Sequence, residues 1–177
     1  KIINAHSMDY ETFIRNKNKP RPSYIPSKNY LVFLADTPWG GHDFELSSFQ
    51  TISKTSYKKI INNFFNELEK KTNLKIIISA HPKQTQKDNI YFPRKFCTQD
   101  TEQLIKYSKG LVCHFSGAIS YAILNSKPIC FFYHKNWENV DYFSYNIQRY
   151  QEALKNKFNV IDDNFNCEKV KFFYNKK

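Results

Sequence analysis

Continuous apolar runs separated by segments with helical periodicity constrain the fold of this chain more than any other feature. The run at 30–35 (YLVFLA) carries no charged side chain, which is typical of a strand buried on both faces. A single helical stripe follows at 54–71, formed by Tyr57, Ile60, Ile61, Phe64, Phe65 and Leu68. Buried strands that alternate with amphipathic helices indicate βαβ units. The sequence therefore predicts an α/β fold with a Rossmann-like, doubly wound parallel sheet.

The same pattern predicts the remaining elements. Further strands are expected at 74–80, near 90–92, and at 111–115, 128–133 and 158–161, and further helices at 99–108, 117–126 and 143–156. Ser53 or Thr55, Thr98 and Ser116 are the expected residues at the helix N-termini. We expect five or six strands in an order close to 3-2-1-4-5.

The first 28 residues are polar and contain three prolines, Pro20, Pro22 and Pro26. Proline fixes φ and removes a backbone donor, so this stretch is predicted to be neither a helix nor a central strand. We expect a linker or extended segment over 1–28 and one nucleotide-sugar-binding domain over 29–177.

The net charge of +11 has two interpretations. It can indicate a polyanionic partner, such as anionic lipid or a phosphorylated substrate. It can also be compositional, because 23 of the 27 basic residues are Lys and the chain holds 18 Asn, as an AT-rich genome produces. The apolar strands carry none of the aromatic–basic motifs of RNA-binding sheets, so no nucleic-acid partner is expected.

The four cysteines, Cys97, Cys113, Cys130 and Cys167, show neither CxxC nor zinc-finger spacing. We expect free thiols in a reducing compartment and no structural metal. No apolar run approaches the ~20 residues that span a bilayer, and no signal peptide is recognisable. A cytoplasmic location is expected, with peripheral contact at the inner membrane face.

Ligands bind at the carboxyl ends of the strands in doubly wound sheets, and His81 follows one such strand. An imidazole there can donate to a phosphate oxygen or protonate a leaving phosphate, while Pro82 turns the chain. A His-Pro pair also ends strands that bind nothing, and both interpretations stay open.

The segment Ser116-Gly117-Ala118 follows another strand and opens a helix. A helix N-terminus offers free N–H groups to an anion, and Gly117 lets the backbone approach it closely. A phosphate cradle is one interpretation, and an ordinary Ser N-cap is the other.

Two more segments follow strand ends. The loop after the first strand contains Gly40, Gly41 and His42, but neither GxGxxG nor GxxxxGK[ST]. Tyr133 and Trp137 lie where a base, ribose or sugar could bind, although a polar loop explains them equally well. His114 precedes Phe115 within a strand and is expected to be packed.

These features, with the stretch TQDTEQLIKYSKGLVCHFSGAISYAILNSKPICFF at 98–132, resemble the donor-binding C-terminal lobe of GT-B fold bacterial glycosyltransferases. The sialyltransferase, polysialyltransferase and capsule polysaccharide biosynthesis groups are similar over about residues 29–133. They carry a His-Pro motif and, one strand later, a Ser motif. Lys127-Pro128 resembles their turn before the next strand.

The resemblance implies an inverting glycosyltransferase that moves a sugar from a nucleotide-activated donor, with a CMP-linked acid sugar favoured, to a capsule or lipooligosaccharide glycan. His81 would be catalytic and would bind the donor phosphate together with Ser116, Gly117 and Ala118. Gly40, Gly41, His42, Tyr133 and Trp137 would contact the nucleotide or sugar. No metal or cofactor is expected, since the chain lacks DxD.

Two departures from these families matter. Tyr121 stands where many GT-B lobes have Glu, and the catalytic base expected in an N-terminal lobe has no counterpart here. Two alternatives remain, a GT-B-like sugar-nucleotide epimerase and a non-catalytic nucleotide- or nucleic-acid-binding module.

Overall fold

The computed structural model describes residues 7–26, 29–35, 53–81, 84, 87, 92–155, 157–162, 165 and 170–172. Its elements are α1 (Met8–Asn16), β1 (Tyr30–Ala35), α3 (Lys54–Thr72), β2 (Lys75–Ala80), β3 (Phe96–Cys97), α4 (Thr101–Tyr107), β4 (Gly110–Cys113), α5 (Ile119–Leu124), β5 (Ile129–His134), the 3-10 helix η2 (Lys135–Asn139), α6 (Asp141–Leu154) and β6 (Asn159–Ile161).

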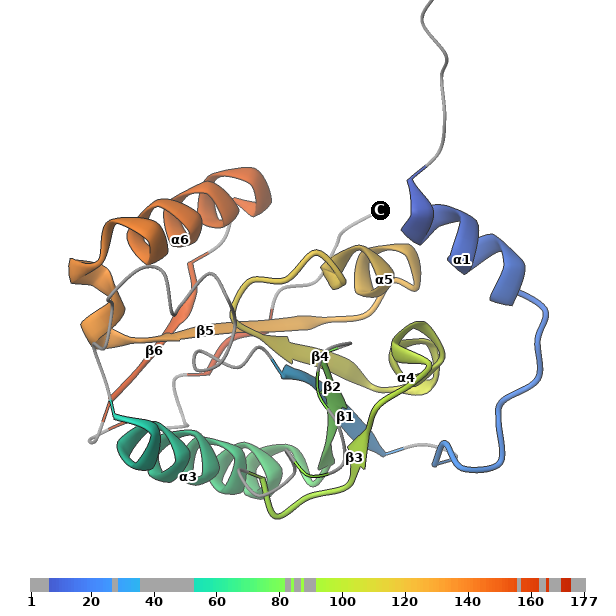
Figure 1. Ribbon diagram of the computed structural model, residues 1–177, viewed down its shortest axis with the longest axis horizontal. Coiled ribbons are helices and arrows are strands. Elements are labelled where there is room, and N and C mark those ends of the chain that lie inside the picture. Colours follow the sequence, from blue (N-terminus) through green and yellow to red (C-terminus); the bar gives the residue numbers. More distant parts are fainter. Residues whose placement is uncertain are drawn as a thin grey trace, which may run out of the picture.

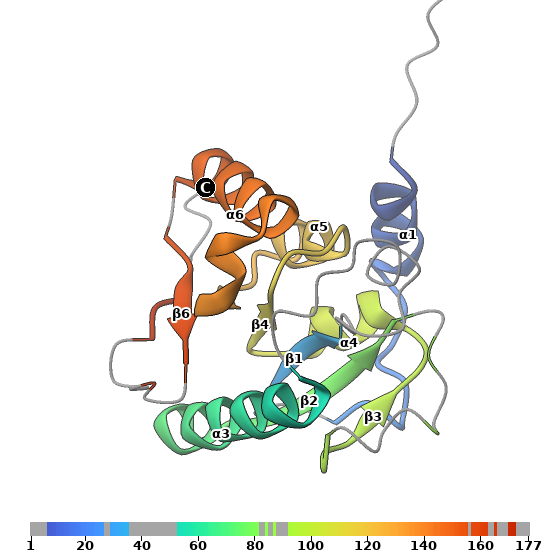
Figure 2. The same cartoon turned by 60° about the vertical axis from the view of Figure 1, so that its left-hand side comes forward.

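The strands form one six-stranded sheet in the order β3-β2-β1-β4-β5-β6, and all neighbours run parallel. Figure 1 and Figure 2 show α3 beneath this sheet, α4, α5 and α6 on its other side, and α1 beside α4 and α5. The predicted Rossmann-like α/β fold is confirmed, including its strand order.

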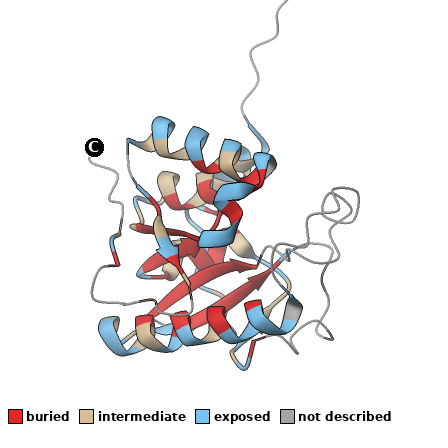
Figure 3. Cartoon of the chain, turned by 90° about the vertical axis from the view of Figure 1, so that its left-hand side faces the viewer, coloured by how far each residue is buried: buried red, intermediate tan, exposed pale blue. Residues whose placement is uncertain are grey.

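The core lies on both faces of the sheet, as the red strands of Figure 3 show. All six residues of β1 are buried, because helices cover both of its faces. Figure 3 also shows α3 buried along one side only, and the six residues of its predicted stripe are each at most 6% exposed. Ring contacts join this stripe to the sheet, with 4.8 Å between the centroids of Phe65 and Phe33.

The ends of α3 follow the expected chemistry. Ser53 is the N-cap, and its hydroxyl accepts a hydrogen bond from the Ser56 N–H at 3.1 Å. Asn73 ends the helix in the left-handed conformation with φ of 55°. Lys70 and Lys71 occupy the last turn, where cations stabilise the helix dipole.

The expectation that residues 1–28 contain no helix is wrong, because Met8–Asn16 form α1. Hydrogen bonds join α1 to α4 and α5. Asn16 is buried and donates to the Glu102 carboxylate on α4 at 2.9 Å, and the Asp9 carboxylate accepts from Ser120 on α5 at 2.5 Å. The three prolines begin four residues after α1 ends, so they do not interrupt it.

Three further expectations are corrected. A strand forms at Phe96–Cys97, and Phe92, the described part of the stretch expected near 90–92, lies outside any strand and packs against Phe33. The N-cap of α4 is Asp100, not Thr98, and no side chain caps its N–H groups. The helix after β4 begins at Ile119, later than expected.

Among the cysteines that the structure describes, Cys97, Cys113 and Cys130 are free thiols. Cys113 and Cys130 are buried in β4 and β5, as their apolar context predicts. Cys167 lies outside the described residues.

Candidate functional site

The carboxyl ends of β2, β1 and β4 lie side by side at one edge of the sheet. Ala35, the last residue of β1, pairs with Ala80, the last residue of β2, and β1 also pairs with β4. The chain leaves β1 for α3 on one face and leaves β4 for α5 on the other (Figure 1). The topological switch point therefore lies between β1 and β4, where doubly wound sheets bind their ligands.

His81 is exposed and comes directly after β2. Its backbone is fixed by Gln84, whose side-chain Oε1 accepts from the His81 N–H and whose N–H donates to the His81 carbonyl, both at 2.8 Å. The imidazole is therefore carried by an anchored turn at the ligand edge. Pro82, expected to make that turn, lies outside the described residues.

Residues 116–118 form a tight turn rather than the first turn of a helix. The Ser116 hydroxyl accepts from the Ala118 N–H at 3.4 Å, and the N–H groups of Ile119 and Ser120 donate to the carbonyls three residues earlier. Ala118 is the N-cap of α5. The prediction that Ser116 opens the helix is therefore wrong, although it still lies at the end of β4.

The surroundings of Gly117 are open. A Cβ placed on Gly117 would meet no atom of the described residues within 4 Å, and the residue is exposed. A ligand can therefore approach the backbone of this turn from solvent, as the prediction for residues 116–118 requires.

His114 is packed beneath this edge, as expected. The ring is 2% exposed, and its Nδ1 lies 2.9 Å from the carbonyl of Phe132 on β5. Because a carbonyl can only accept, Nδ1 carries the hydrogen and Nε2 accepts from the Tyr57 hydroxyl at 2.6 Å. Burial lowers the pKa of His114 to about 3, so the ring is neutral and fixed in one tautomer.

Tyr57 was not foreseen as a site-supporting residue. It belongs to the predicted apolar stripe of α3, and periodicity alone does not show that its hydroxyl meets His114, the residue directly after β4. The pair joins α3 to the end of β4 at the switch point.

Trp137 does not fit its predicted role as a ligand contact. It is 2% exposed, and its indole stacks on Phe143 with 4.8 Å between centroids and meets His114 edge to face at 4.7 Å. A ring enclosed by aromatic neighbours cannot also present a face to a nucleotide, so Trp137 is a core residue.

Tyr133 lies at the end of β5 and is 7% exposed. Its hydroxyl donates to Glu138 at 2.6 Å, and burial together with that carboxylate raises its pKa. It lines a hollow of about 660 Å³ along α6, with Gln148 and Lys155 among the other lining residues. The Tyr133 hydroxyl is thus already hydrogen-bonded, but the side chain borders a space that a small polar ligand could enter.

The predicted contacts Gly40, Gly41 and His42 lie outside the described residues. Their contribution to the site stays a prediction.

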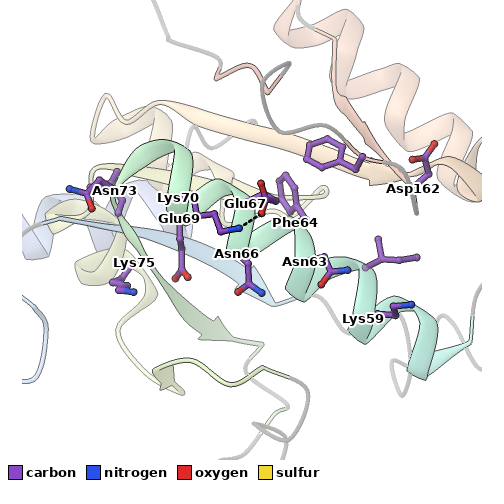
Figure 4. Close-up of a pocket in the computed structure, with 13 residues that line it drawn as sticks. Lys59, Asn63, Phe64, Asn66, Glu67, Glu69, Lys70, Asn73, Lys75 and Asp162 are labelled. Carbon is purple, nitrogen blue, oxygen red and sulfur yellow. Dashed lines mark hydrogen bonds and ion pairs between the residues drawn. The ribbon is translucent and has the colours of Figure 1, made fainter.

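A larger groove of about 1090 Å³ runs along α3 and is also lined by Asp162 and Phe165 (Figure 4). Three cations and three anions line it, Lys59, Lys70, Lys75, Glu67, Glu69 and Asp162. Lys70 and Glu67 pair at 2.7 Å, as the dashed line shows. Balanced charge suits a neutral, hydroxyl-rich ligand, but none of the predicted site residues lines this groove.

The described residues contain no group of three or more His, Cys, Asp or Glu side chains that could hold a metal ion. Nor is any helix in that part of the chain long and apolar enough to cross a membrane.

Comparisons with known proteins give no match to a protein-family model, to a curated protein or to a solved structure.

Proposed function

We propose that this chain is the donor-binding domain of an inverting glycosyltransferase. The donor is a nucleotide-activated sugar, with a CMP-linked acid sugar favoured, and the acceptor is a bacterial surface glycan. The observation that supports this proposal is the position of two polar residues about the switch point: His81 follows β2, Ser116 follows β4, and β1 lies between these strands.

The spacing suits a phosphate. Neighbouring strands are about 4.8 Å apart, so the axes of β2 and β4 are separated by roughly 10 Å. A phosphate group in the crevice between them would lie within reach of both the His81 imidazole and the turn at Ser116.

In the proposed reaction, a base from another lobe removes the acceptor proton and the acceptor oxygen attacks the anomeric carbon. Negative charge then develops on the leaving phosphate. His81 stabilises this charge by donating a hydrogen bond or a proton, and the Ser116 hydroxyl and the Gly117 N–H supply further donors. The chain's own residues therefore serve the leaving group, and the base lies elsewhere.

Activated nucleotide donors are cytoplasmic metabolites, so the proposed site of action is the cytoplasm, with peripheral contact at the inner membrane face. The partners are the nucleotide-sugar and the glycan acceptor.

A thermal-shift panel of CMP, CDP, UDP and GDP tests this proposal. A ligand at 100 times its Kd stabilises the folded state by about 2.7 kcal/mol. A domain of 150–250 residues gains roughly 2–4 °C in Tm per kcal/mol, so we expect a shift of roughly 5–11 °C. We expect the cytidine nucleotides to give the largest shift. Four unchanged melting curves at millimolar nucleotide would contradict the proposal.

A further inference from the structure

Lysines form a row along the edge of the sheet where the strands begin. The pairing registers, extended by one or two residues, place Lys75, Tyr30, Lys109 and Lys127 at one level in four neighbouring strands. The Lys109 N–H donates to the Tyr30 carbonyl at 2.8 Å, which fixes part of this row. Three strand spacings separate its ends, a width of about 14 Å.

Three more lysines adjoin the row at the C-terminal end of α4. The Lys106 ammonium donates to the carbonyls of Asn16 and Lys17 at 2.7 and 2.9 Å, which holds the end of α1 beside α4. Tyr107, on the same turn of α4, donates to the Lys19 carbonyl. We call these six residues the lysine edge: Lys17, Lys19, Lys75, Lys106, Lys109 and Lys127.

Among the described residues no carboxylate forms an ion pair with a member of the lysine edge, although Glu69 lies near Lys75 and accepts from the Ile76 N–H at 2.7 Å. The two ion pairs in that part of the chain are Lys70–Glu67 and Arg94–Glu69, and neither includes a member of it. The pKa of Lys127 is lowered, first by burial and then by the charge of Lys109. Like charges are therefore held close enough to repel one another.

Helix dipoles explain only part of this arrangement. Cations near helix C-termini are stabilising, and Lys106 stands in the last turn of α4. Lys75 and Lys109 stand instead at strand starts and are exposed. Neither lysine forms an ion pair among the described residues, so both charges are open to an anion from outside the domain.

We propose that the lysine edge docks this domain on an anionic membrane surface, with phospholipid headgroups as the partner. The Lys106 and Lys127 ammonium groups donate to backbone carbonyls, and the other four lysines of the edge are exposed. A broad row of cations on a rigid sheet fits a flat anionic surface, where each exposed lysine contributes separately.

Two observations favour a membrane over a nucleic acid. The cations of the row are lysines, whereas arginine is the residue that matches phosphate geometry in nucleic-acid recognition. Arg94 lines a hollow together with Lys75, but its guanidinium is already paired with Glu69. Single strands also need open aromatic rings for base stacking. Tyr107, the ring beside Lys106, lies under its ammonium at 5.2 Å and has its hydroxyl engaged.

Docking through this edge also sets the orientation of the domain. The strands are parallel, so the lysine edge lies at the opposite end of the sheet from His81. The carboxyl edge would then face away from the bilayer and stay open to solutes. This inference does not depend on the proposed enzymatic function.

Vesicle co-sedimentation tests the inference with a triple variant, K19Q/K75Q/K109Q, whose three side chains are exposed. The matched control is K58Q/K59Q/K135Q, which removes the same charge from exposed positions in the first turns of α3 and after β5. Vesicles of phosphatidylcholine with 30% phosphatidylserine are compared with phosphatidylcholine alone. Unchanged thermal melts establish that both variants are folded.

We expect wild type and control to bind the anionic vesicles and to dissociate at high salt. The lysine-edge variant should bind on the order of a hundredfold more weakly. Equal losses in the two variants, or equal binding to neutral vesicles, would overturn the inference. The inference would also be overturned if the domain bound single-stranded RNA more tightly than anionic vesicles and the lysine-edge variant lost that RNA binding. RNA would then be the partner.

Discussion

The Tyr57 hydroxyl lies 2.6 Å from Nε2 of His114, and both side chains are buried. The second ring nitrogen of His114 is held by the Phe132 carbonyl. One imidazole therefore connects α3, the end of β4 and β5 directly beneath the predicted ligand edge.

Removing the Tyr57 hydroxyl should destabilise the fold. In Tyr57→Phe the Nε2 atom of His114 loses its donor in a site that water does not reach, and an unsatisfied buried acceptor costs about 1–3 kcal/mol. Urea denaturation should show this as a lower midpoint with an unchanged slope. Tyr145→Phe is the control, because Tyr145 is 59% exposed. A Tyr57→Phe midpoint equal to that of wild type would mean that the bond contributes no net stability.

Acid should weaken the fold through His114. Its pKa is about 3 in the folded state and near 6.5 in an unfolded chain, so between these values the unfolded state binds a proton that the native state excludes. The contribution of neutral, buried His114 to the free energy of unfolding is fully present above about pH 6.5. It falls as the pH decreases, by about 1.4 kcal/mol at pH 5.5. Urea titrations at pH 7.5, 6.5 and 5.5 measure the loss.

The double variant Tyr57→Phe/His114→Phe isolates this contribution, because it replaces both partners by apolar groups of similar shape. Other titrating groups remain, but its loss of stability between pH 7.5 and 5.5 should be smaller than that of wild type. Parallel pH profiles for the two proteins would exclude His114 as the source.

The docking of α1 should depend on Glu102, which is 3% exposed and accepts from Asn16 and from Asn125. Glu102→Ala leaves the buried Asn16 amide without its acceptor. We expect trypsin to cut faster after Arg15 and Lys17, while the sheet stays folded. Glu11→Ala removes an exposed carboxylate of α1 and should leave cleavage unchanged. Equal cleavage rates in both variants would show that α1 is held by other contacts.

Ser116→Ala should cost less stability than the loss of a helix cap, which is typically about 1 kcal/mol. Ser116 accepts one long hydrogen bond, at 3.4 Å, within a turn, so thermal melts should differ from wild type by a degree or two at most, roughly 0.3 kcal/mol. A loss of 1 kcal/mol or more would mean that Ser116 acts as a cap in solution.

The sequence predicted the elements whose burial is uniform or regular. A run such as Tyr30–Ala35 has one stable environment, the middle of a sheet, and the stripe of α3 has one face to bury. Helix α1 was missed because the three prolines argued against a helix over the whole segment 1–28, and its apolar residues at helical spacing, Tyr10, Phe13 and Ile14, span little more than one turn. Ser7, whose hydroxyl accepts from the Tyr10 N–H, is the signal that could have revealed it.

The candidate site was predictable only in part. Strand ends located His81 and Ser116, because topology alone brings the carboxyl ends of parallel strands together. The sequence could not show which of Tyr133 and Trp137 borders an open space. The structure places Tyr133 at a hollow and Trp137 among aromatic neighbours in the core. The short strand Phe96–Cys97 was missed because two residues are too few to show a strand's hydrophobic pattern.

Calorimetric titration of wild type and His81→Ala with the nucleotide that gives the largest thermal shift tests the central claim most directly. Asn139→Ala, an exposed substitution after β5, serves as the control. A charge-assisted hydrogen bond contributes roughly 1.5–3 kcal/mol, so His81→Ala should weaken nucleotide binding by about ten- to a hundredfold. Asn139→Ala should bind the nucleotide with wild-type affinity. The melting temperatures of both variants should stay close to that of wild type. Equal nucleotide affinity in wild type and His81→Ala would contradict the assignment of His81 to the donor phosphate.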